Sequence, residues 1–323
     1  MSWWALLLLA WGLAAALQLG LWLWQRRTGS ATVVDAGWAG SLAGMALLYA
    51  ALGEGGLEHR VLVGVTGGLA FGRLTWLLAR RVRDEEDPRY RELRRRWRER
   101  GDEQVRFFVF FQAQAFAAVL LSLPLLAAAY NDHDGLEWLE WAGLAVWLAG
   151  ATLEAVADRQ LVAFRRDAAN RGAVIDVGVW RFSRHPNYFG QWLTWCGYAL
   201  IGLPAPWGWV GLLSPALMLY LILFVTGIPP LEERLLASRG DAYRSYQRRT
   251  SAFVPLPPRR TLGIEGAVTR EVEWVPDGDW NEWIPRDGGF DGLDFPRRIT
   301  WGIDSHGLRW LRLATDLDVE FRS

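Results

Sequence analysis

The chain has 323 residues, of which 51% are hydrophobic, and its 35 basic and 35 acidic residues leave no net charge. The apolar residues come in long blocks with few charges, which excludes an ordinary soluble protein folded around one core. The single cysteine excludes an intramolecular disulfide, and the four histidines are scattered without the spacing of metal ligands. The sequence therefore predicts an all-α polytopic membrane protein without a metal site.

Apolar runs follow one another along the chain. In order they are Ser2 to Trp24, Ala31 to Gly53, Val61 to Ala79, Phe107 to Tyr130, Leu136 to Phe164, and two runs between Tyr188 and Ile228. Most are long enough to cross a hydrocarbon core of about 30 Å, which takes about 20 helical residues. The first run is too long for a signal peptide and lacks a basic region before it. We therefore expect about seven transmembrane helices.

The arginines predict the orientation of these helices. With the N-terminus outside, the loops inside the cell carry Arg26 and Arg27, Arg80 to Arg106, Arg165 to Arg184, and the tail from Arg234. The outside loops, "GEGGLEH" and "NDHDG", are acidic or neutral. Because basic residues of short loops stay on the cytoplasmic side, we expect the N-terminus outside and the C-terminus in the cytoplasm. Arginines confined to the inner membrane face also argue against nucleic-acid binding.

The last 63 residues differ from the rest of the chain. After "FVPLPPRR", residues 261–323 hold 13 acidic residues against 7 arginines. The segments "RRITWGI" and "LRWLRLATDLDVEF" flank a turn-like "DSHG" and predict a β-hairpin. We expect a transmembrane domain over residues 1–260 and a small, acidic, tryptophan-rich, β-rich cytoplasmic appendage over residues 261–323. A partly disordered acidic tail is the alternative.

Charged residues near the inner end of the fifth expected helix form a first candidate group. Glu154 and Asp158 are four residues apart and share a helix face, and Arg165 and Arg166 follow about two turns later. Carboxylates at this depth of a membrane span usually face a cavity or a partner. We expect a polar cavity that opens to the cytoplasm.

The stretch "SRHPNYFG", Ser183 to Gly190, forms a second group. Its proline suits the first turn of a helix, and Ser183 is a candidate cap. Arg184 and His185 stand just before that turn, and Asn187 and Tyr188 fall within it, beside N–H groups that attract anions. The set suits a phosphate or pyrophosphate. The alternative is an ordinary interfacial anchor.

A third group follows the last expected span. "GIPPLEERLLASRGDAYRSYQRR" combines a proline break, the adjacent carboxylates Glu232 and Glu233, and an amphipathic surface helix with Tyr243 and Tyr246. Three separated segments thus bring polar groups to one membrane depth.

The segments "GVWRFSRHPNYFGQWLTWCGYAL", "GIPPLEERL" and "YQRRTSAFVPLPP" resemble the C-terminal region of the membrane steroid 5α-reductase superfamily. The resemblance runs from about Val33 to Pro258 and is strongest to a bacterial membrane branch of unassigned function. It implies a seven-helix enzyme of the inner membrane that binds NADPH in a cavity open to the cytoplasm. It also implies reduction of a carbon–carbon double bond conjugated to a ketone, in a lipid-soluble substrate.

The resemblance also implies cofactor-binding residues. Asp158 matches an aspartate that contacts the cofactor, Arg165 an arginine at its phosphate end, and Asn187 the asparagine of an Asn-aromatic-x-Gly motif. Glu154 stands where the steroid enzymes have asparagine. The full expected set is Glu154, Asp158, Arg165, Arg166, Arg184, His185, Asn187, Tyr188, Glu233, Tyr243 and Tyr246.

The catalytic pair of the steroid enzymes, a glutamate on helix 2 and a tyrosine on helix 3, is not found here. Arg73 matches a family arginine, but the tyrosine's place falls at Ala70, and helix 2 offers Asp35 near its inner end. Asp35 is the candidate acid, and Arg73 is the candidate for charge stabilisation or for holding such an acid.

Two other functions stay open. Membrane methyltransferases that use S-adenosylmethionine on a lipid or prenylated acceptor share the arginine-histidine-proline motif and the paired glutamates. The adjacent arginines Arg165 and Arg166 favour NADPH, because the methyl donor has no phosphates. The third possibility is a membrane scaffold without a cofactor, whose acidic tail binds a partner.

Overall fold

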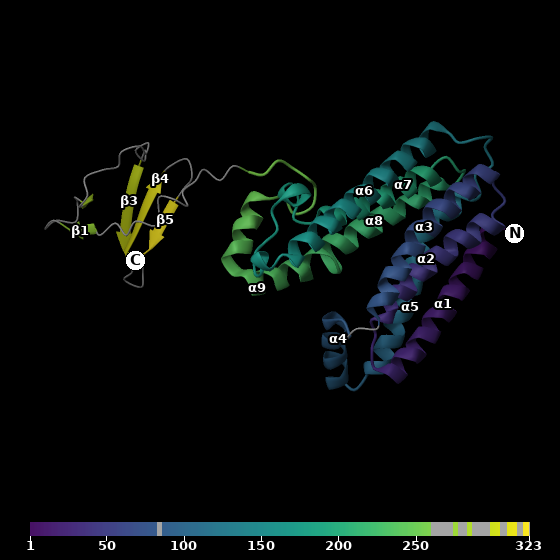
Figure 1. Ribbon diagram of the computed structural model, residues 1–323, viewed down its shortest axis with the longest axis horizontal. Coiled ribbons are helices and arrows are strands. Elements are labelled where there is room, and N and C mark those ends of the chain that lie inside the picture. Colours follow the sequence, from purple (N-terminus) through teal and green to yellow (C-terminus); the bar gives the residue numbers. More distant parts are fainter. Residues whose placement is uncertain are drawn as a thin grey trace. The chain divides into compact units, whose positions relative to one another are not determined.

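The computed structural model describes residues 1–82, residues 86–259 and five strand segments further along the chain. The chain divides into two compact units, Met1–Arg260 and Thr261–Ser323, and each is described by itself (Figure 1). The roles expected for these two parts stay predictions.

The first unit is built from helices. They are α1 Trp3–Thr28, α2 Val33–Leu52, α3 Leu57–Arg81, α4 Pro88–Glu99, α5 Glu103–Ala128, α6 Trp138–Arg166, α7 Pro186–Gly202, α8 Leu213–Tyr220 and α9 Ile228–Arg249. Short 3₁₀ segments occupy Ala168–Asn170, Gly178–Arg181 and Gly208–Leu212, and a π-helical turn, Leu221–Val225, joins α8 to the segment before α9.

Six segments of the described ranges are long and apolar enough to cross a membrane. They are Trp3–Thr28, Val33–Leu52, Leu57–Arg80, Glu103–Ala128, Trp138–Arg166 and Gly208–Arg249. Several such helices fit an integral membrane protein. The remaining expected span, the sixth in chain order, corresponds to α7, which has only 17 residues because it begins at Pro186 and a turn follows at residues 203–207. The count of seven and the orientation of the termini stay predictions.

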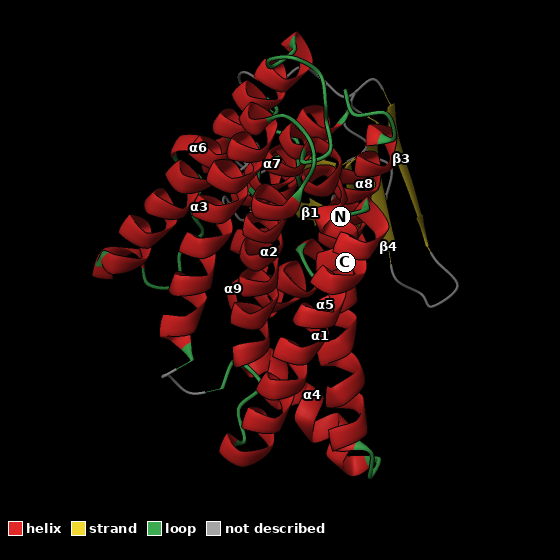
Figure 2. Ribbon diagram, turned by 90° about the vertical axis from the view of Figure 1, so that its right-hand side faces the viewer, coloured by secondary structure: helices red, strands yellow, loops and turns green. Residues whose placement is uncertain are grey.

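The helices of the first unit form two groups. The first group holds α1, α2, α3 and α5, which pack on one another, and the second holds α6, α7 and α8. The end of α5 connects the two, because it also packs on α7 and α8. The groups lie together near the N-terminus and diverge towards α4 and α9 (Figure 1), and Figure 2 shows the helices from the side where the N-terminus lies.

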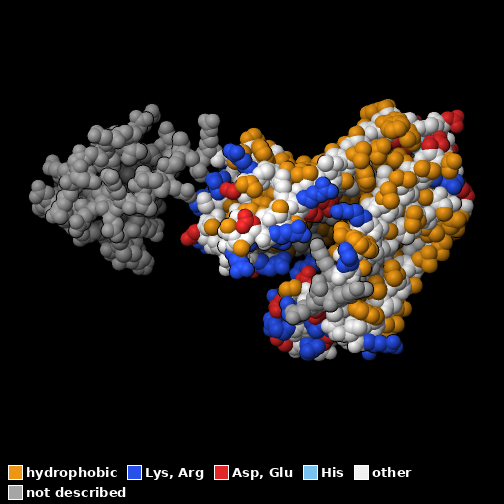
Figure 3. All heavy atoms as spheres, viewed as in Figure 1, with side chains coloured by type: hydrophobic (Ala, Val, Ile, Leu, Met, Phe, Trp, Pro, Cys, Tyr) orange, Lys and Arg blue, Asp and Glu red, His pale blue; other side chains and the backbone are white. Residues whose placement is uncertain are grey.

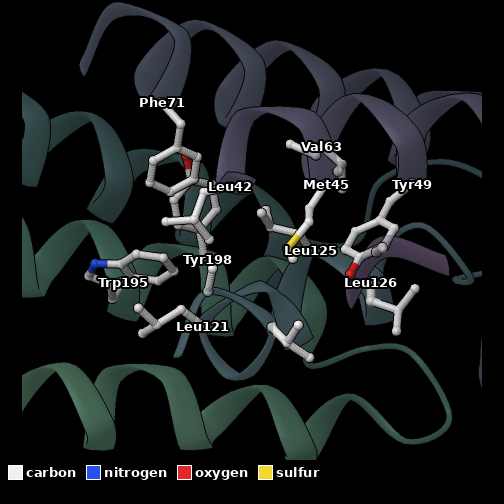
Figure 4. Packing of buried hydrophobic residues seen from close by; sticks show 14 of the residues in the cluster. Leu42, Met45, Tyr49, Val63, Phe71, Leu121, Leu125, Leu126, Trp195 and Tyr198 are labelled. Carbon is white, nitrogen blue, oxygen red and sulfur yellow. The ribbon is translucent and has the colours of Figure 1, made fainter. Parts of the chain in front are cut away.

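An aromatic cluster fills the place where the two groups meet. The ring of Phe71 on α3 lies 5.5 Å from that of Trp195 and 5.8 Å from that of Tyr198, both on α7 (Figure 4). The Tyr198 hydroxyl donates to the carbonyl of Thr66 at 3.0 Å. The buried phenol therefore has a partner, and the cluster holds α7 against α3.

Glycines bring α6 and α7 into backbone contact. Gly143 and Gly150 on α6, and Gly190 and Gly197 on α7, are each seven residues apart and so share one helix face. A Cβ atom at Gly190 would lie only 2.7 Å from the backbone nitrogen of Glu154, and one at Gly150 would lie 2.6 Å from the carbonyl of Gly190. This packing places the polar end of α6 beside the first turn of α7.

The first turn of α7 begins as expected at Pro186, but the expected cap is wrong. His185, directly before the proline, occupies the cap position and makes no side-chain cap bond. The Ser183 hydroxyl instead accepts a hydrogen bond from the His185 N–H at 3.1 Å and donates to the carbonyl of Phe253 at 2.8 Å. Ser183 therefore links the start of α7 to the segment after α9.

Helix α9 contains a sharp turn at Gly240. This residue has φ 50° and ψ −124°, a conformation that a residue with a Cβ adopts only with strain. The turn divides α9 into two pieces and lets Tyr243 and Tyr246 fold back, where both are buried.

Helix α4 is short, arginine-rich and packed on α5. Asp87 caps it by accepting a hydrogen bond from the Arg89 N–H at 2.8 Å, and Pro88 occupies its first turn. The Trp97 ring lies 4.8 Å from that of Phe107, and the buried Tyr90 belongs to the same cluster. One face of α4 is thereby fixed to the bundle, while most of its arginines face outward.

The second unit contains short antiparallel strands. Strand β1 Trp274–Pro276 pairs with β2 Trp283–Pro285, and β3 Arg298–Ile303, β4 Arg309–Ala314 and β5 Val319–Arg322 pair in that order. Strands β3 and β4 fall on the two segments that predict a hairpin. That this unit is a cytoplasmic appendage stays a prediction.

Candidate functional site

Polar side chains border the space between the two helix groups at the end where they diverge. Figure 3 shows Arg and Asp or Glu side chains around a hollow between the α4 end and the α9 end, while hydrophobic side chains dominate the rest of the first group on this face. We call this feature the inner hollow. At the same end of the helices, a hydrogen bond and charge–charge interactions connect Glu154, Asp158 and Asn187 with Arg73 and, through Tyr188, with Arg89.

A carboxylate–amide pair joins the two segments that predict a cofactor site. The Asn187 side-chain amide donates to the Asp158 carboxylate at 3.2 Å. One turn earlier on α6, the Glu154 carboxyl interacts electrostatically with Asp158 and with Arg73, which lies on α3. The structure therefore brings together three members of the expected set, and Arg73 faces them from the other helix group.

Tyr188 lies beside this pair. Its ring stacks on His185, with ring centres 5.5 Å apart and planes 11° from parallel. Its hydroxyl feels the charges of Arg89, Arg234 and Asp158. The guanidinium groups of α4 and α9 thus lie close enough to act on the first turn of α7.

Asp35, the candidate acid, is engaged by the residues around the start of α4. One of its oxygens accepts a hydrogen bond from the Tyr90 hydroxyl at 2.6 Å, and the other pairs with Arg89 at 3.1 Å. Burial and the negative charge of Asp35 raise the pKa of Tyr90. Burial alone would raise the pKa of Asp87, but its hydrogen bonds from Arg89 hold that pKa below its usual value. Asp35 therefore fastens α4 to α2.

A second polar cluster forms around Glu232 on α9. Its carboxylate accepts hydrogen bonds from Arg184, with Nε at 2.7 Å and Nη2 at 3.2 Å. It also accepts from His185 Nε2 at 3.1 Å, from the Tyr243 hydroxyl at 3.2 Å and from Gln247 Nε2 at 2.8 Å. We call these five residues the Glu232 clasp.

The remaining donors of Arg184 are also used within the protein. Its Nη1 donates to the carbonyls of Gln247 at 3.1 Å and Thr250 at 2.6 Å. Its backbone N–H donates to the carbonyl of Ser251 at 2.8 Å. The Tyr246 hydroxyl donates to the carbonyl of Trp180 at 2.5 Å. These bonds fix the chain before α7 to the end of α9.

The expected cofactor residues thus fall into three sets. Glu154, Asp158, Asn187 and Tyr188 lie together where α6 meets the first turn of α7. Arg184, His185, Tyr243 and Tyr246 are engaged in or beside the Glu232 clasp. Arg165, Arg166 and Glu233 are exposed. Arg165 lies on the same face of α6 as Glu154 and Asp158, because residues 4, 7 and 11 apart share a face.

Sequence reasoning missed several residues of this region. It chose Glu233 of the adjacent carboxylates, whereas Glu232 is the one that points into the bundle. It predicted a charged surface helix after Pro88 but gave this helix no part in the site, although Arg89 reaches both Asp35 and the surroundings of Tyr188. The arginine density of that helix was the available signal.

The chain matches, over residues 21–250, the family described as "Protein of unknown function (DUF1295)". It belongs to the DUF1295 family.

Three curated proteins are similar to this DUF1295 member. Steroid 5-alpha-reductase DET2 of Arabidopsis thaliana is 32% identical over 87 residues, which are 25% of this chain and 31% of that protein. The protein of the same name from Gossypium hirsutum is 28% identical over 82 residues, 25% of this chain and 30% of that protein. An uncharacterized protein of Schizosaccharomyces pombe is 24% identical over 177 residues, 46% of this chain and 48% of that protein.

The matched segments cover less than half of each of these relatives. No solved structure matches the chain. The DUF1295 match and the similarity to the two plant reductases confirm the expected membership of the steroid 5α-reductase-like superfamily.

Proposed function

We propose that this DUF1295 member is an integral membrane reductase that uses NADPH to reduce an activated carbon–carbon double bond in a lipid-soluble substrate. The observation that carries the proposal is the Asp158–Asn187 hydrogen bond, which joins α6 to the first turn of α7. The similarity to the plant steroid 5-alpha-reductases supports the reaction class.

The donor set fits a phosphate-bearing cofactor. Within residues 1–82 and 86–259, Arg73, Arg165 and Arg166 form no ion pair, so their guanidinium groups are available to an anion. The amide of Asn187 keeps its oxygen and one N–H for a ligand after it has bonded Asp158. When bound, the cofactor would supply the hydride.

The protein's own residues would bind and orient the cofactor and shield the site from water. Asp158, Asn187 and Tyr188 would hold the cofactor against α6 and α7, and Arg165 with Arg166 would take its phosphates. The Glu232 clasp would hold the first turn of α7 in place. Glu233 is kept as an exposed peripheral candidate.

The catalytic roles follow from the same contacts. Arg73 faces Glu154 across the two helix groups and would stabilise negative charge on a substrate oxygen. Both oxygens of Asp35 already accept hydrogen bonds, which favours a positioning role for this residue over that of the acid. A substrate would reach the hollow from the bilayer, which favours a sterol-, isoprenoid- or acyl-like compound.

Calorimetric titration of the detergent-purified chain with NADPH, NADH and S-adenosylmethionine tests the proposal. We expect NADPH binding that weakens by at least about 10- to 100-fold in the Arg165→Ala, Asn187→Ala double variant, because a single hydrogen bond to a charged group contributes about 1.5–3 kcal/mol. Arg27→Ala is the matched control, since Arg27 is exposed at the end of α1.

Two outcomes contradict the proposal. Binding of S-adenosylmethionine alone would favour a methyltransferase acting on a lipid or prenylated acceptor. No binding of any of the three would favour a membrane scaffold and leave "SRHPNYFG" as an anchor of the C-terminal segment.

A further inference from the structure

The chain keeps α4 close to the end of a candidate membrane span. Residues 100–102 are all that separate α4 from α5, whose segment Glu103–Ala128 is long and apolar enough to cross a membrane. Because one residue spans at most about 3.5 Å, the end of α4 lies no more than about 14 Å from the start of α5. The headgroups of a membrane begin where such a span ends, so α4 lies at their level.

The apolar side of α4 is used within the protein. Tyr90, Leu93 and Trp97 recur at intervals of three and four residues and pack with aromatic side chains at the start of α5. Arg94 lies on the same side, is only 11% exposed and is paired with two carboxylates. This side of α4 therefore cannot enter the lipid, and its packing fixes which side chains the helix turns outward.

An open pocket of about 310 Å³ lies among the arginines of α4. Figure 3 shows Arg side chains, interspersed with Asp and Glu, gathered at this end of the first helix group. We call it the α4 pocket; the side chains that line it are Glu86, Arg91, Arg94, Arg95, Arg98 and Glu99. Arg91, Arg95 and Arg98 are four and three residues apart, so they form one stripe along the helix.

The α4 pocket has a surplus of positive charge. Glu86 is already engaged by Arg94, with Nη2 of the arginine 2.9 Å from its carboxylate. Glu99 is then the one exposed carboxylate among three exposed arginines of the lining. Arg95 and Arg98 pair with nearby glutamates, but these arginines are 60% and 70% exposed, and such pairs are weak because water screens them. The pocket therefore favours an anion, and guanidinium groups bind phosphate oxygens through paired hydrogen bonds.

An apolar stripe of α5 continues from the α4 pocket along the candidate span. Arg98 also lines a second depression, together with Val105 of α5. Val109 and Phe116 follow four and eleven residues after Val105, intervals that share a helix face, and all three side chains are exposed. We call these three residues the α5 stripe. In a membrane span, exposed apolar side chains of this kind face acyl chains.

We propose that the α4 pocket binds the phosphate headgroup of an anionic membrane phospholipid, whose acyl chains lie along the α5 stripe. A phospholipid with a net negative charge matches the positive surplus of the pocket, whereas the headgroup cation of a zwitterionic lipid offsets its phosphate. A free anion would match the pocket but leave the α5 stripe unused.

Native mass spectrometry of the detergent-purified chain tests the proposal. It gives the dissociation constants of phosphatidylglycerol and of phosphatidylcholine with the same acyl chains. We expect phosphatidylglycerol to bind about 30-fold more tightly, since each of two surplus arginines near a membrane surface contributes about fivefold. In the Arg95→Gln, Arg98→Gln double variant, the two lipids should bind equally. Glutamine resembles arginine in helix propensity, so α4 should stay helical.

The matched control is the Arg26→Gln, Arg27→Gln double variant. It removes two exposed arginines from the end of α1, outside the α4 pocket. That end of α1 lies beside the start of α5, because the Gln25 amide donates to the side chain of Gln104 at 2.9 Å. The control should keep the wild-type preference for phosphatidylglycerol.

Three outcomes would overturn the proposal. Equal affinities of the wild-type chain for the two lipids would refute it without recourse to any variant. Loss of the preference in both double variants would mean that general attraction to the basic end of the helices acts, instead of the pocket. Displacement of phosphatidylglycerol by an equal concentration of inorganic phosphate would assign the pocket to a free anion.

Discussion

Replacement of Glu232 by alanine removes the acceptor at the centre of the Glu232 clasp. Five hydrogen bonds to its carboxylate are lost, two of them from Arg184. The side chains of Glu232 and Arg184 are only 15% and 11% exposed, so the guanidinium would stay largely buried without its counter-charge. Breaking a buried pair in this way costs about 3–5 kcal/mol. At about 2–4 °C per kcal/mol for a unit of this size, the thermal midpoint should fall by about 6–20 °C.

The assay is thermal unfolding of the purified chain in detergent, together with limited trypsin digestion. Helix α9 carries five arginines, at positions 234, 239, 244, 248 and 249, and loosening of the clasp should expose them to the protease. Glu233→Ala removes the neighbouring exposed carboxylate and should change the stability by less than about 0.5 kcal/mol. If the two variants unfold within that margin of each other, the clasp does not hold α9 and the reasoning is refuted.

Further predictions concern the helix contacts. Gly190→Ala should destabilise the chain by about 1–3 kcal/mol, because its Cβ meets the backbone of Glu154 and α6 must move. The same change at Gly12, where a Cβ would have nothing within 4 Å, should be neutral or stabilising. The thermal midpoints of the two variants test this difference. Gly240→Ala should cost at least about 1 kcal/mol through backbone strain and raise tryptic cleavage of α9, although the site is open. In a double-mutant cycle of Asp35→Asn and Arg89→Ala, the interaction energy between the two residues should be about 1 kcal/mol. Additive losses of stability would mean that the two residues do not fasten α4 together. Ser183→Ala should cost about 1–3 kcal/mol in unfolding measurements, since it leaves the buried Phe253 carbonyl and His185 N–H without this partner.

The sequence predicted local features of the fold well. Uncharged runs of about 20 residues can satisfy their backbone groups inside a bilayer only as helices, which is why the spans could be located without tertiary information. Pro186 and Pro88 each favour the start of a helix for a local reason. The proline ring fixes φ at a helical value, and the first turn does not need the N–H that proline lacks. Helix α7 ends at Gly202, just before Pro204 and Pro206, because proline cannot continue a helix.

The candidate site was predictable only in part. Asp158 and Asn187 were found through motifs on two segments, and the structure joins them. The same motif also contains Arg184 and His185, and whether these face an open hollow or a carboxylate depends on α9, which lies nearly 50 residues further along the chain.

The sequence by itself determined the membrane class, the helix starts, the superfamily and the residue types available at the diverging end of the helices. Only the tertiary structure decided which partner each of those residues meets. Glu232 and Glu233 differ by about 100° around the helix, and packing alone chooses the one that turns inward. The positive φ of Gly240 returns Tyr243 and Gln247 to Glu232, and Asp35 is paired by Arg89 of α4, 54 residues away. Such contacts carry no local signal in the sequence. A residue's preference for helix or strand depends on its neighbours in the sequence, whereas the partner of its side chain depends on the path of the whole chain.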